Sequence, residues 1–147
     1  MAILKLKPSC KDYLWGGTRL KTEFGKEYDK EPLAESWELS CHPDGPSYIV
    51  NGEFAGKTLQ EYIDANGKTE VTGTHCKDFE MFPVLIKFID ARKDLSIQVH
   101  PDDSFALENE GQYGKTEMWY VVDAQEGASL FYGFSREVSE KEFKERI

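Results

Sequence analysis

The stretch Leu95-Ser96-Ile97-Gln98-Val99-His100-Pro101-Asp102-Asp103 decides how we interpret the rest of the chain. In this stretch, two β-branched apolar residues alternate with Ser96, Gln98 and His100. A β-strand would bury the apolar pair and present the three polar side chains on its other face. On its own the pattern is typical of a half-buried antiparallel strand with a solvated polar face, and a second stretch is needed to favour a functional site.

That second stretch is Gly114-Lys115-Thr116-Glu117-Met118-Trp119-Tyr120. Its alternation predicts another strand, with Lys115, Glu117 and Trp119 on one face. A short helix over 103–110, closed by Gly111, would join the two strands, which could then face each other across a sheet or barrel interior. Histidine, glutamate and glutamine together supply nitrogen and oxygen donors that suit a divalent ion such as Zn²⁺.

The most apolar run is Phe82–Asp90, and it contains a single lysine, Lys87. Such a run predicts a strand buried on both faces, where an unpaired ammonium group would be costly. Lys87 either extends to solvent at the margin of the sheet or points into a polar cavity to serve an anion or a proton transfer. The turn at 91–94 predicts a hairpin with the strand over 95–100, which would bring Lys87 near Ser96.

The N-terminal part alternates strand and turn patterns. Residues 2–7 predict a first strand that Pro8 ends, and residues 33–40 predict another. In the latter, Glu35 and Trp37 share one face while Ser36 and Glu38 share the other, and we expect both carboxylates to be solvated. Between these strands, the sequence Trp15-Gly16-Gly17 predicts either a turn with a core tryptophan or one wall of a ligand pocket.

Local signals predict three further elements. Asn51-Gly52 between apolar residues predicts a hairpin over 47–54. Thr58-x-x-Glu61 is a capping box that starts a helix ending at Gly67. Ser139-x-x-Glu142 is a second capping box, and the sequence stops about two turns after it.

Composition limits the function classes. The 147 residues are 39% hydrophobic and carry a formal net charge of −9, which fits one globular domain over 1–147 and argues against nucleic acid or an anionic membrane as partner. A small anionic substrate remains possible, because local cations can outweigh a distant, screened acidic surface. The N-terminus has no signal-peptide pattern and no run is long enough to span a membrane, so we expect a cytoplasmic protein.

The three cysteines do not indicate a disulfide framework or a zinc knuckle. Their number is odd and no CxxC spacing occurs, which favours reduced thiols. Cys41-His42 and His75-Cys76 could be imagined as four zinc ligands, but adjacent residues point to opposite sides of a strand and the usual two-to-four-residue spacing is missing. We therefore do not expect zinc there.

Taken in order, these motifs resemble the N-terminal half of the type I mannose-6-phosphate isomerases, a family of cupin-fold zinc enzymes. The resemblance runs through Trp15-Gly16-Gly17, residues 34–38, residues 82–87, the stretch 95–103, residues 114–120 and Phe131-Tyr132-Gly133-Phe134. It implies a mainly β fold, an antiparallel cupin-type jelly-roll barrel with a few short helices. Leu-Ser-Ile-Gln-Val-His-Pro followed by Gly-Lys-Thr-Glu-Met-Trp is a specific match.

The resemblance also implies roles for individual residues. Gln98, His100 and Glu117 match zinc ligands of a single Zn²⁺, and the family's fourth ligand, a histidine from a later strand, has no match here. Lys87 and Lys115 match positions that could anchor the anion or move protons, and Trp15, Glu35 and Ser96 match the substrate pocket. The implied reaction interconverts mannose 6-phosphate and fructose 6-phosphate by moving a proton from C2 to C1, assisted by the metal.

Because relatives continue into a second cupin half, we expect this chain to be truncated before it, with an incomplete site. The alternative is a non-catalytic cupin module that binds a metal or a sugar phosphate and completes its barrel by self-association or by pairing with another chain through an open barrel edge. A third reading is a cupin isomerase for a different sugar phosphate. The sequence leaves the catalytic base, the native metal and the oligomeric state open.

Overall fold

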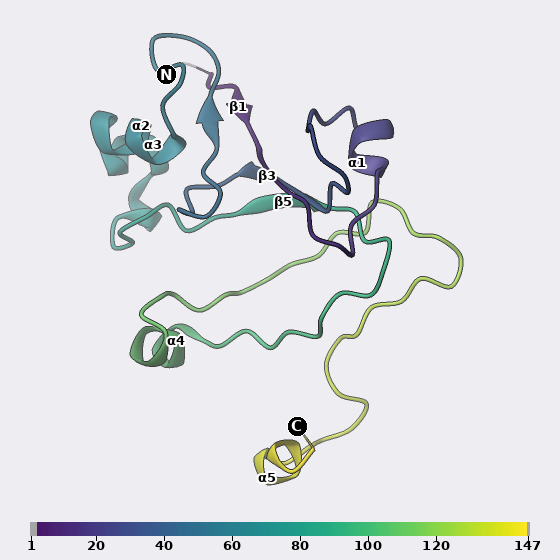
Figure 1. Ribbon diagram of the computed structural model, residues 1–147. Coiled ribbons are helices and arrows are strands. Elements are labelled where there is room, and N and C mark those ends of the chain that lie inside the picture. The colour runs from purple at the N-terminus through teal and green to yellow at the C-terminus, as the bar shows by residue number, and fades with distance from the viewer. Residues whose placement is uncertain (1–2, 147) are drawn as a thin grey trace. The chain divides into compact units, whose positions relative to one another are not determined.

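The computed structural model describes residues 3–146, which form small antiparallel sheets and short helices (Figure 1). In chain order the elements are β1 (Leu6–Lys7), β2 (Ser9–Lys11), α1 (Arg19–Thr22), β3 (Glu35–Leu39), β4 (Tyr48–Ile49), α2 (Leu59–Asn66), α3 (Lys68–Thr72), the 3-10 helix η1 (Thr74–Cys76), β5 (Ile86–Ile89), α4 (Asp103–Asn109) and α5 (Glu140–Lys144). The contacts gather in two compact units, the first ending at Leu95 and the second beginning at Ser96. The expectation of a single domain over 1–147 stays a prediction.

The first unit is built on a three-stranded sheet in the order β2-β3-β5, with both pairings antiparallel. Trp37 of β3 lies opposite Ser9 on one side and opposite Lys87 on the other. A register irregularity follows between Trp37 and Leu39. The predicted strand over 33–40 is therefore confirmed at its centre, and its two faces carry the side chains that the alternation predicts. Of the strand predicted over 2–7, only Leu6–Lys7 forms strand β1, which ends before Pro8 as predicted and pairs with β4; residue 2 lies outside the described residues.

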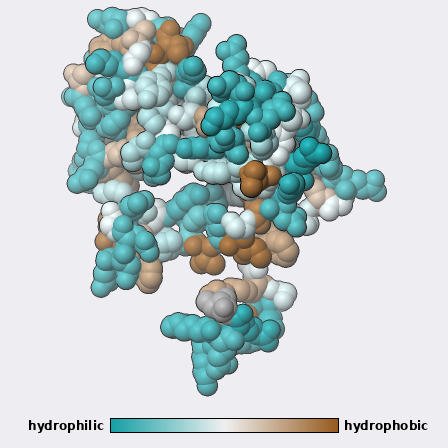
Figure 2. Space-filling model, viewed as in Figure 1, coloured by the Kyte–Doolittle hydropathy of each residue, from teal (hydrophilic) through white to brown (hydrophobic). Residues whose placement is uncertain are grey.

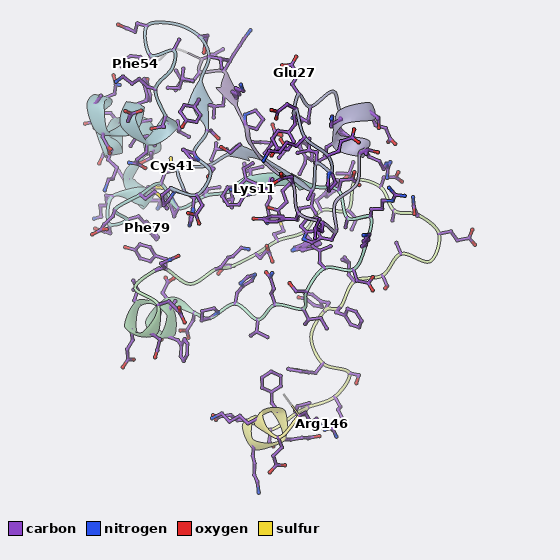
Figure 3. All side chains as sticks on the ribbon, viewed as in Figure 1. Lys11, Glu27, Cys41, Phe54, Phe79 and Arg146 are labelled. Carbon is purple, nitrogen blue, oxygen red and sulfur yellow. The ribbon has the colours of Figure 1, made fainter. Side chains whose placement is uncertain are left out.

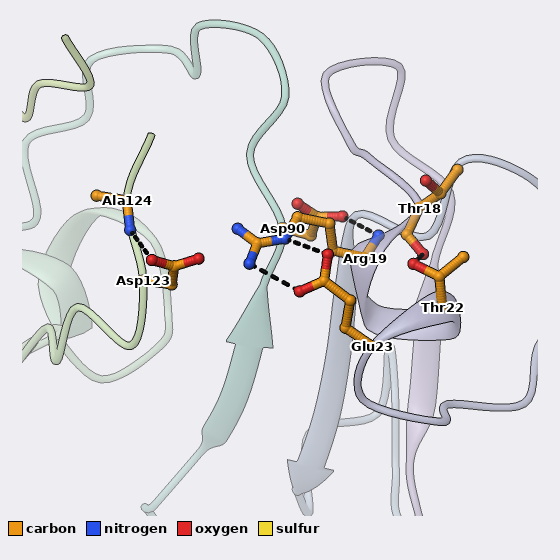
Figure 4. Close-up of polar contacts among 7 residues, drawn as sticks. All are labelled: Thr18, Arg19, Thr22, Glu23, Asp90, Asp123 and Ala124. Atoms are coloured by element: carbon orange, nitrogen blue, oxygen red, sulfur yellow. Dashed lines mark hydrogen bonds and ion pairs between the residues drawn. The ribbon is translucent and has the colours of Figure 1, made fainter. Parts of the chain in front are cut away.

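The two glycines after Trp15 are explained by close packing. A Cβ on Gly16 would lie 2.5 Å from Ala34 Cα, and one on Gly17 would lie 2.4 Å from the Asp90 carboxylate. The Asp90 carboxylate also accepts a hydrogen bond of 2.7 Å from the backbone N–H of Arg19, next to the start of α1 (Figure 4). These residues fasten the turn to the ends of β3 and β5, which a side chain at either glycine would prevent.

The core of the first unit lies where α2 covers the chain after β3. Cys41, Leu59 and Ile63 are buried there, and Figure 3 shows Cys41 beside the helices. Partly buried side chains surround them, namely Leu4, Leu6, Leu39, Val71, Met81 and Phe82. The predicted capping box of α2 is confirmed, with both reciprocal bonds between Thr58 and Glu61 present and Gly67 at the C-cap.

The predicted hairpin at Asn51-Gly52 is present as a turn rather than as two regular strands. Gly52 has a φ of +70°, and Ile49 exchanges hydrogen bonds with the returning chain at Gly56 and Lys57. The Asn51 side chain accepts from the Lys5 N–H at 2.7 Å and donates to the Ile3 carbonyl at 2.9 Å. This loop thereby holds the N-terminal segment beside β4.

Three sequence predictions about strands are wrong within the described residues. Neither 95–100 nor 114–120 forms a regular strand, and β5 pairs with β3 instead of forming a hairpin with 95–100. The apolar residues meant to be buried are open to solvent, with Ile97 74%, Val99 76% and Met118 90% exposed. Apolar side chains reach the visible surface as brown patches in Figure 2. Strand formation depends on burial against neighbours, which these segments lack.

The burial of the apolar run over 82–90, which contains β5, also differs from the prediction. Val84, Leu85 and Ile86 are 44%, 36% and 54% exposed, so the run is not buried on both faces. Residues 3–146 form two separate sheets, of two and three strands, and no closed barrel. The mainly antiparallel architecture with short helices is confirmed, whereas the jelly-roll barrel is not seen in this part of the chain.

The helices of the second unit begin where predicted. Helix α4 starts after Asp102, whose side chain accepts from Phe105 N–H, and Gly111 follows it with a φ of +65°. Helix α5 starts after Ser139, which accepts from Glu142 N–H, but the Glu142 carboxylate pairs with Arg136. Across residues 3–146, no helix has the length and apolarity needed to cross a bilayer.

Candidate active site

The first group of candidate residues lies on one face of β3 and β5. Lys87 Nζ is 3.0 Å from Glu35 Oε1, and the indole N–H of Trp37 donates to Glu35 Oε2 at 2.7 Å. Glu35 is only 5% exposed, so the expectation that it is solvated is wrong. Burial of this carboxylate is tolerated because each oxygen has a donor and one donor is a cation.

The sequence left two alternatives for Lys87, extension to solvent at the margin of the sheet or a position in a polar cavity, and neither describes its contact fully. Its side chain is 20% exposed and contacts a buried carboxylate of the same chain. The cost of placing an ammonium group in an apolar run is offset by this ion pair. Two of the predicted site residues, Glu35 and Lys87, are thus brought together.

The opposite face of β3 carries a second pair. Lys26 Nζ lies 2.7 Å from Glu38 Oε1, which also accepts from the Ser36 hydroxyl at 2.7 Å. Burial raises the pKa of the neighbouring Cys10 thiol, against the opposing effect of a hydrogen bond with Ser36. This pair involves none of the predicted site residues and serves as an internal comparison.

Trp15 is half-buried and stacks on Tyr13, with ring centroids 5.6 Å apart. Its carbonyl accepts hydrogen bonds from the N–H groups of Arg92 and Lys93, both at 3.0 Å. The structure therefore shows a turn with a partly buried ring, fixed to the chain after β5. The role of Trp15 in a ligand pocket stays a prediction.

The second group of candidate residues lies in the second unit. His100 Nε2 is 3.4 Å from Glu117 Oε2, and Lys115 Nζ is 3.0 Å from Glu117 Oε1. The His100 and Glu117 side chains are 25% and 28% exposed. Two ligands at ordinary zinc–nitrogen and zinc–oxygen distances, at a tetrahedral angle, lie about 3.4 Å apart. The spacing of this pair therefore fits a shared zinc ion.

The backbone around Gly114 brings this pair together. Lys115 N–H donates to the Pro101 carbonyl at 3.2 Å, and Gly114 N–H donates to Asp103 Oδ1 at 2.9 Å. A Cβ on Gly114 would lie only 2.4 to 2.7 Å from backbone atoms of 101–103. Only glycine permits this approach, which places the segment carrying Glu117 beside the one carrying His100.

The third expected ligand, Gln98, contacts a residue of its own segment. The Gln98 side-chain amide donates to Ser96 Oγ at 3.1 Å. No group of three or more His, Cys, Asp or Glu side chains within residues 3–146 is arranged to hold a metal ion. The structure thus brings His100 and Glu117 together, while the side-chain nitrogen of Gln98 bonds to Ser96.

The pKa of Glu117 is lowered from its ordinary value. Desolvation opposes this shift, but hydrogen bonds from Trp119 and Lys115, with the nearby charges of Lys115 and His100, outweigh it. The carboxylate is therefore held in its charged form, which is the form that binds a cation.

Sequence reasoning did not assign a role to Trp37, Trp119 or Gly114. Both tryptophans follow a glutamate by two positions and bond to it, so the repeated pattern Glu-x-Trp was the signal available. Residues two apart share a face in an extended segment, which lets an indole reach the carboxylate. Each of these glutamates also contacts a lysine, Lys87 or Lys115.

Cys41 and His42, two residues of the alternative zinc set, pack against other side chains of the first unit. Cys41 belongs to the core, where burial raises its pKa to about 11. The His42 ring instead packs edge-on against Trp37, with centroids 5.9 Å apart.

Comparisons with known proteins extend over most of the chain. The family model described as phosphomannose isomerase type I, catalytic domain, matches residues 3–131. A mannose-6-phosphate isomerase of Streptococcus mutans is 42% identical over 134 residues, covering 91% of this chain and 41% of that protein. The chain spans about two fifths of the length of its curated relatives from Bacillus subtilis and Streptococcus mutans.

Solved structures of mannose 6-phosphate isomerases are also similar to this chain. The crystal structure of the mannose 6-phosphate isomerase from Bacillus subtilis matches with a TM-score of 0.79 at 43% identity, covering 87% of this chain and 40% of that chain. A mannose 6-phosphate isomerase bound with zinc and yttrium matches with a TM-score of 0.62 at 31% identity, covering 76% and 29% of the two chains.

Proposed function

Because the chain belongs to the type I phosphomannose isomerase family and matches its catalytic domain, we propose that it carries the N-terminal part of a zinc-dependent isomerase of mannose 6-phosphate and fructose 6-phosphate. The observation that carries the proposal is the contact between His100 and Glu117 at 3.4 Å, flanked by Lys115. A nitrogen and a carboxylate oxygen at this spacing suit zinc. The cation beside them suits an anionic substrate.

Residues of this chain have separate proposed roles. His100 and Glu117 would hold the metal, with the side-chain carbonyl oxygen of Gln98 as a third ligand. The metal, when bound, supplies a Lewis acid that favours loss of the C2 proton. Lys87 and Lys115 anchor the anion or hold a proton at Nζ, and Trp15, Glu35 and Ser96 contact the sugar phosphate.

The proposal includes the closure of a cupin jelly roll by further strands, because the second unit exposes the apolar alternation that such strands would bury. The relatives supply more than half of their length beyond the region matched here. Pairing with a second chain through an open barrel edge would bury the same apolar residues. A cytoplasmic location follows from the metabolic substrate and stays part of the proposal.

A coupled assay for fructose 6-phosphate tests the proposed function. The chain, and the same chain extended by the C-terminal part of the Streptococcus mutans relative, are assayed with mannose 6-phosphate and added Zn²⁺. We expect the extended chain to turn over substrate and His100→Ala to lose both turnover and bound zinc. His75→Ala is the matched control, because His75 is exposed on η1 and should leave both unchanged.

Two results would contradict the proposal. If neither form of the chain isomerises the sugar, the enzyme assignment fails, and zinc or sugar-phosphate binding without turnover would favour the cupin binding module. If His100→Ala keeps its zinc, the assignment of the metal ligands is wrong. Turnover of another sugar phosphate in preference to mannose 6-phosphate would keep the assignment of the site residues and change the assigned substrate.

A further inference from the structure

We propose that Trp37 is a positioning residue of the candidate site, and that its indole N–H fixes the orientation in which the Glu35 carboxylate faces Lys87. The inference rests on the proposed function only in so far as Glu35 and Lys87 belong to the substrate pocket. Trp37 itself would touch neither the substrate nor the metal. It acts through the carboxylate.

The first observation is how the two oxygens of Glu35 are divided. Oε2 accepts from the indole at 2.7 Å, and Oε1 lies 3.0 Å from Lys87 Nζ. Because the residue is 5% exposed, water cannot readily replace either donor. Rotation of the carboxylate would leave a buried charge short of a hydrogen bond, so the indole holds it in one orientation.

The second observation is that the indole is itself held in place. Lys11 Nζ lies 4.5 Å from its ring centroid, and the His42 ring packs against it in a T-shaped arrangement. A Cβ on Gly45 would be 2.7 Å from the Trp37 ring, so the backbone there packs directly against it. These contacts restrict rotation of the ring, so its N–H stays directed at Glu35, whose other oxygen faces Lys87.

The consequence for the site concerns where Lys87 Nζ lies. A lysine side chain has four rotatable carbon–carbon bonds, so an unrestrained ammonium would occupy many positions. The fixed carboxylate selects the position that an anionic or hydroxyl group of the substrate would meet. Reduced freedom of a binding group before the ligand arrives lowers the entropic cost of binding.

The opposite face of β3 provides a matched comparison within the same chain. There Ser36 donates to Glu38, which pairs with Lys26 at 2.7 Å. The Lys26 and Lys87 side chains are nearly equally exposed, at 21% and 20%. Each lysine thus pairs with a carboxylate that a second side chain holds, but on opposite faces of one strand.

Competitive acetylation of the lysines, followed by mass spectrometry of peptides, tests the proposal on the full 147-residue chain. In Trp37→Phe the ring remains but the donor is lost, and we expect labelling of Lys87 to rise about tenfold relative to Lys26. In Ser36→Ala the ratio should move the other way. Glu35→Gln, which removes the charge facing Lys87, sets the upper limit. An unchanged ratio in Trp37→Phe would overturn the proposal.

Loss of structure in Trp37→Phe would raise the labelling of both lysines together. A second measurement therefore uses a variant that keeps the tryptophan. In Glu35→Gln the tryptophan is untouched, so its indole N–H proton resonance reports the acceptor directly. We expect that resonance to shift upfield on loss of the charged acceptor, while the resonances of Trp15 and Trp119 stay in place. If the Trp37 resonance does not move, the hydrogen bond does not hold Glu35 and the proposal fails.

Kinetics then separate this proposal from the proposed function. In the extended, active chain, Trp37→Phe should raise KM for mannose 6-phosphate more than it lowers kcat, because a positioning residue for binding groups is removed. If the extended wild-type chain has no isomerase activity, the proposed function fails, while the labelling ratio and the indole resonance still decide the role of Trp37. If the labelling ratio changes as expected in Trp37→Phe but KM does not change, Trp37 holds Glu35 without serving the site, and the proposal is overturned.

Discussion

Replacement of Gly114 by alanine should separate the segments that carry His100 and Glu117. The added Cβ would lie 2.4 Å from the carbonyl carbon of Asp102 and 2.5 Å from the Pro101 oxygen, whereas ordinary van der Waals contact begins near 3.4 Å. Backbone atoms have no rotamer through which to move aside, so one segment must retreat by about 1 Å. Overpacking of this kind costs about 1 to 3 kcal/mol of unfolding free energy.

The retreat acts directly on the proposed ligand pair. The present separation of 3.4 Å between His100 Nε2 and Glu117 Oε2 suits a shared ion, and a shift of about 1 Å removes that match. Loss of the groups that orient metal ligands lowers affinity about 10- to 100-fold. We expect Gly114→Ala to weaken zinc binding by a factor in this range, measured by competition with a chromogenic chelator.

The matched control for this prediction is Gly133→Ala. Gly133 has a φ of +69° and nothing within 4 Å of an added Cβ, so alanine there introduces backbone strain without a clash. It should cost about 1 kcal/mol of stability and leave zinc affinity unchanged. If Gly114→Ala folds and binds zinc as tightly as the wild-type chain, the close approach at Gly114 does not build the metal site.

Three further outcomes are expected from local contacts of the first unit. Thr58→Ala removes the reciprocal bonds with Glu61 and should lower the unfolding free energy by about 1 kcal/mol, as measured by urea denaturation. Asn51→Ala removes two exposed hydrogen bonds to the N-terminal segment, whose backbone groups then bond to water, and should cost about 1 kcal/mol by the same measurement. Cys41 has a pKa raised to about 11 by burial, so at pH 8 it should alkylate about a hundredfold more slowly than an ordinary thiol, with Cys76 as the comparison. Because burial favours the neutral thiol, the contribution of Cys41 to stability should be complete below about pH 9 and decline as the pH rises toward 11. Thermal unfolding measured in one buffer at about pH 9 and another at about pH 11 would show this decline.

Elements with local signals could be predicted from the sequence. The start of α2 depends on Thr58 and Glu61, which are three residues apart, and the start of α4 depends on Asp102 in the same way. The alternation of β3 also predicted which side chains share a face, because Trp37 bonds to Glu35 and Ser36 bonds to Glu38. Such features need no knowledge of distant segments.

Elements that depend on distant neighbours could not be predicted. The segments 95–100 and 114–120 have strand patterns, but Val99 and Met118 are exposed and no sheet forms around them. The burial of Glu35 was missed because pattern alone cannot show that Lys87, 52 residues later, will face it. The ligand pair His100 and Glu117 was expected from the resemblance, and its closeness depends on Gly114, whose role is visible only in three dimensions.

The position of Lys87 has a consequence for how the chain behaves in solution. Strand β5 is an edge strand of its sheet within the described residues, and the run Val84–Ile89 contains one charge among five apolar residues. Exposed apolar edge strands template intermolecular β-pairing, and a central lysine opposes it. Replacement of Lys87 by methionine would therefore produce a protein prone to aggregate, whose low activity says nothing about chemistry. Lys87→Arg retains the charge that keeps the strand from self-pairing and is the informative variant.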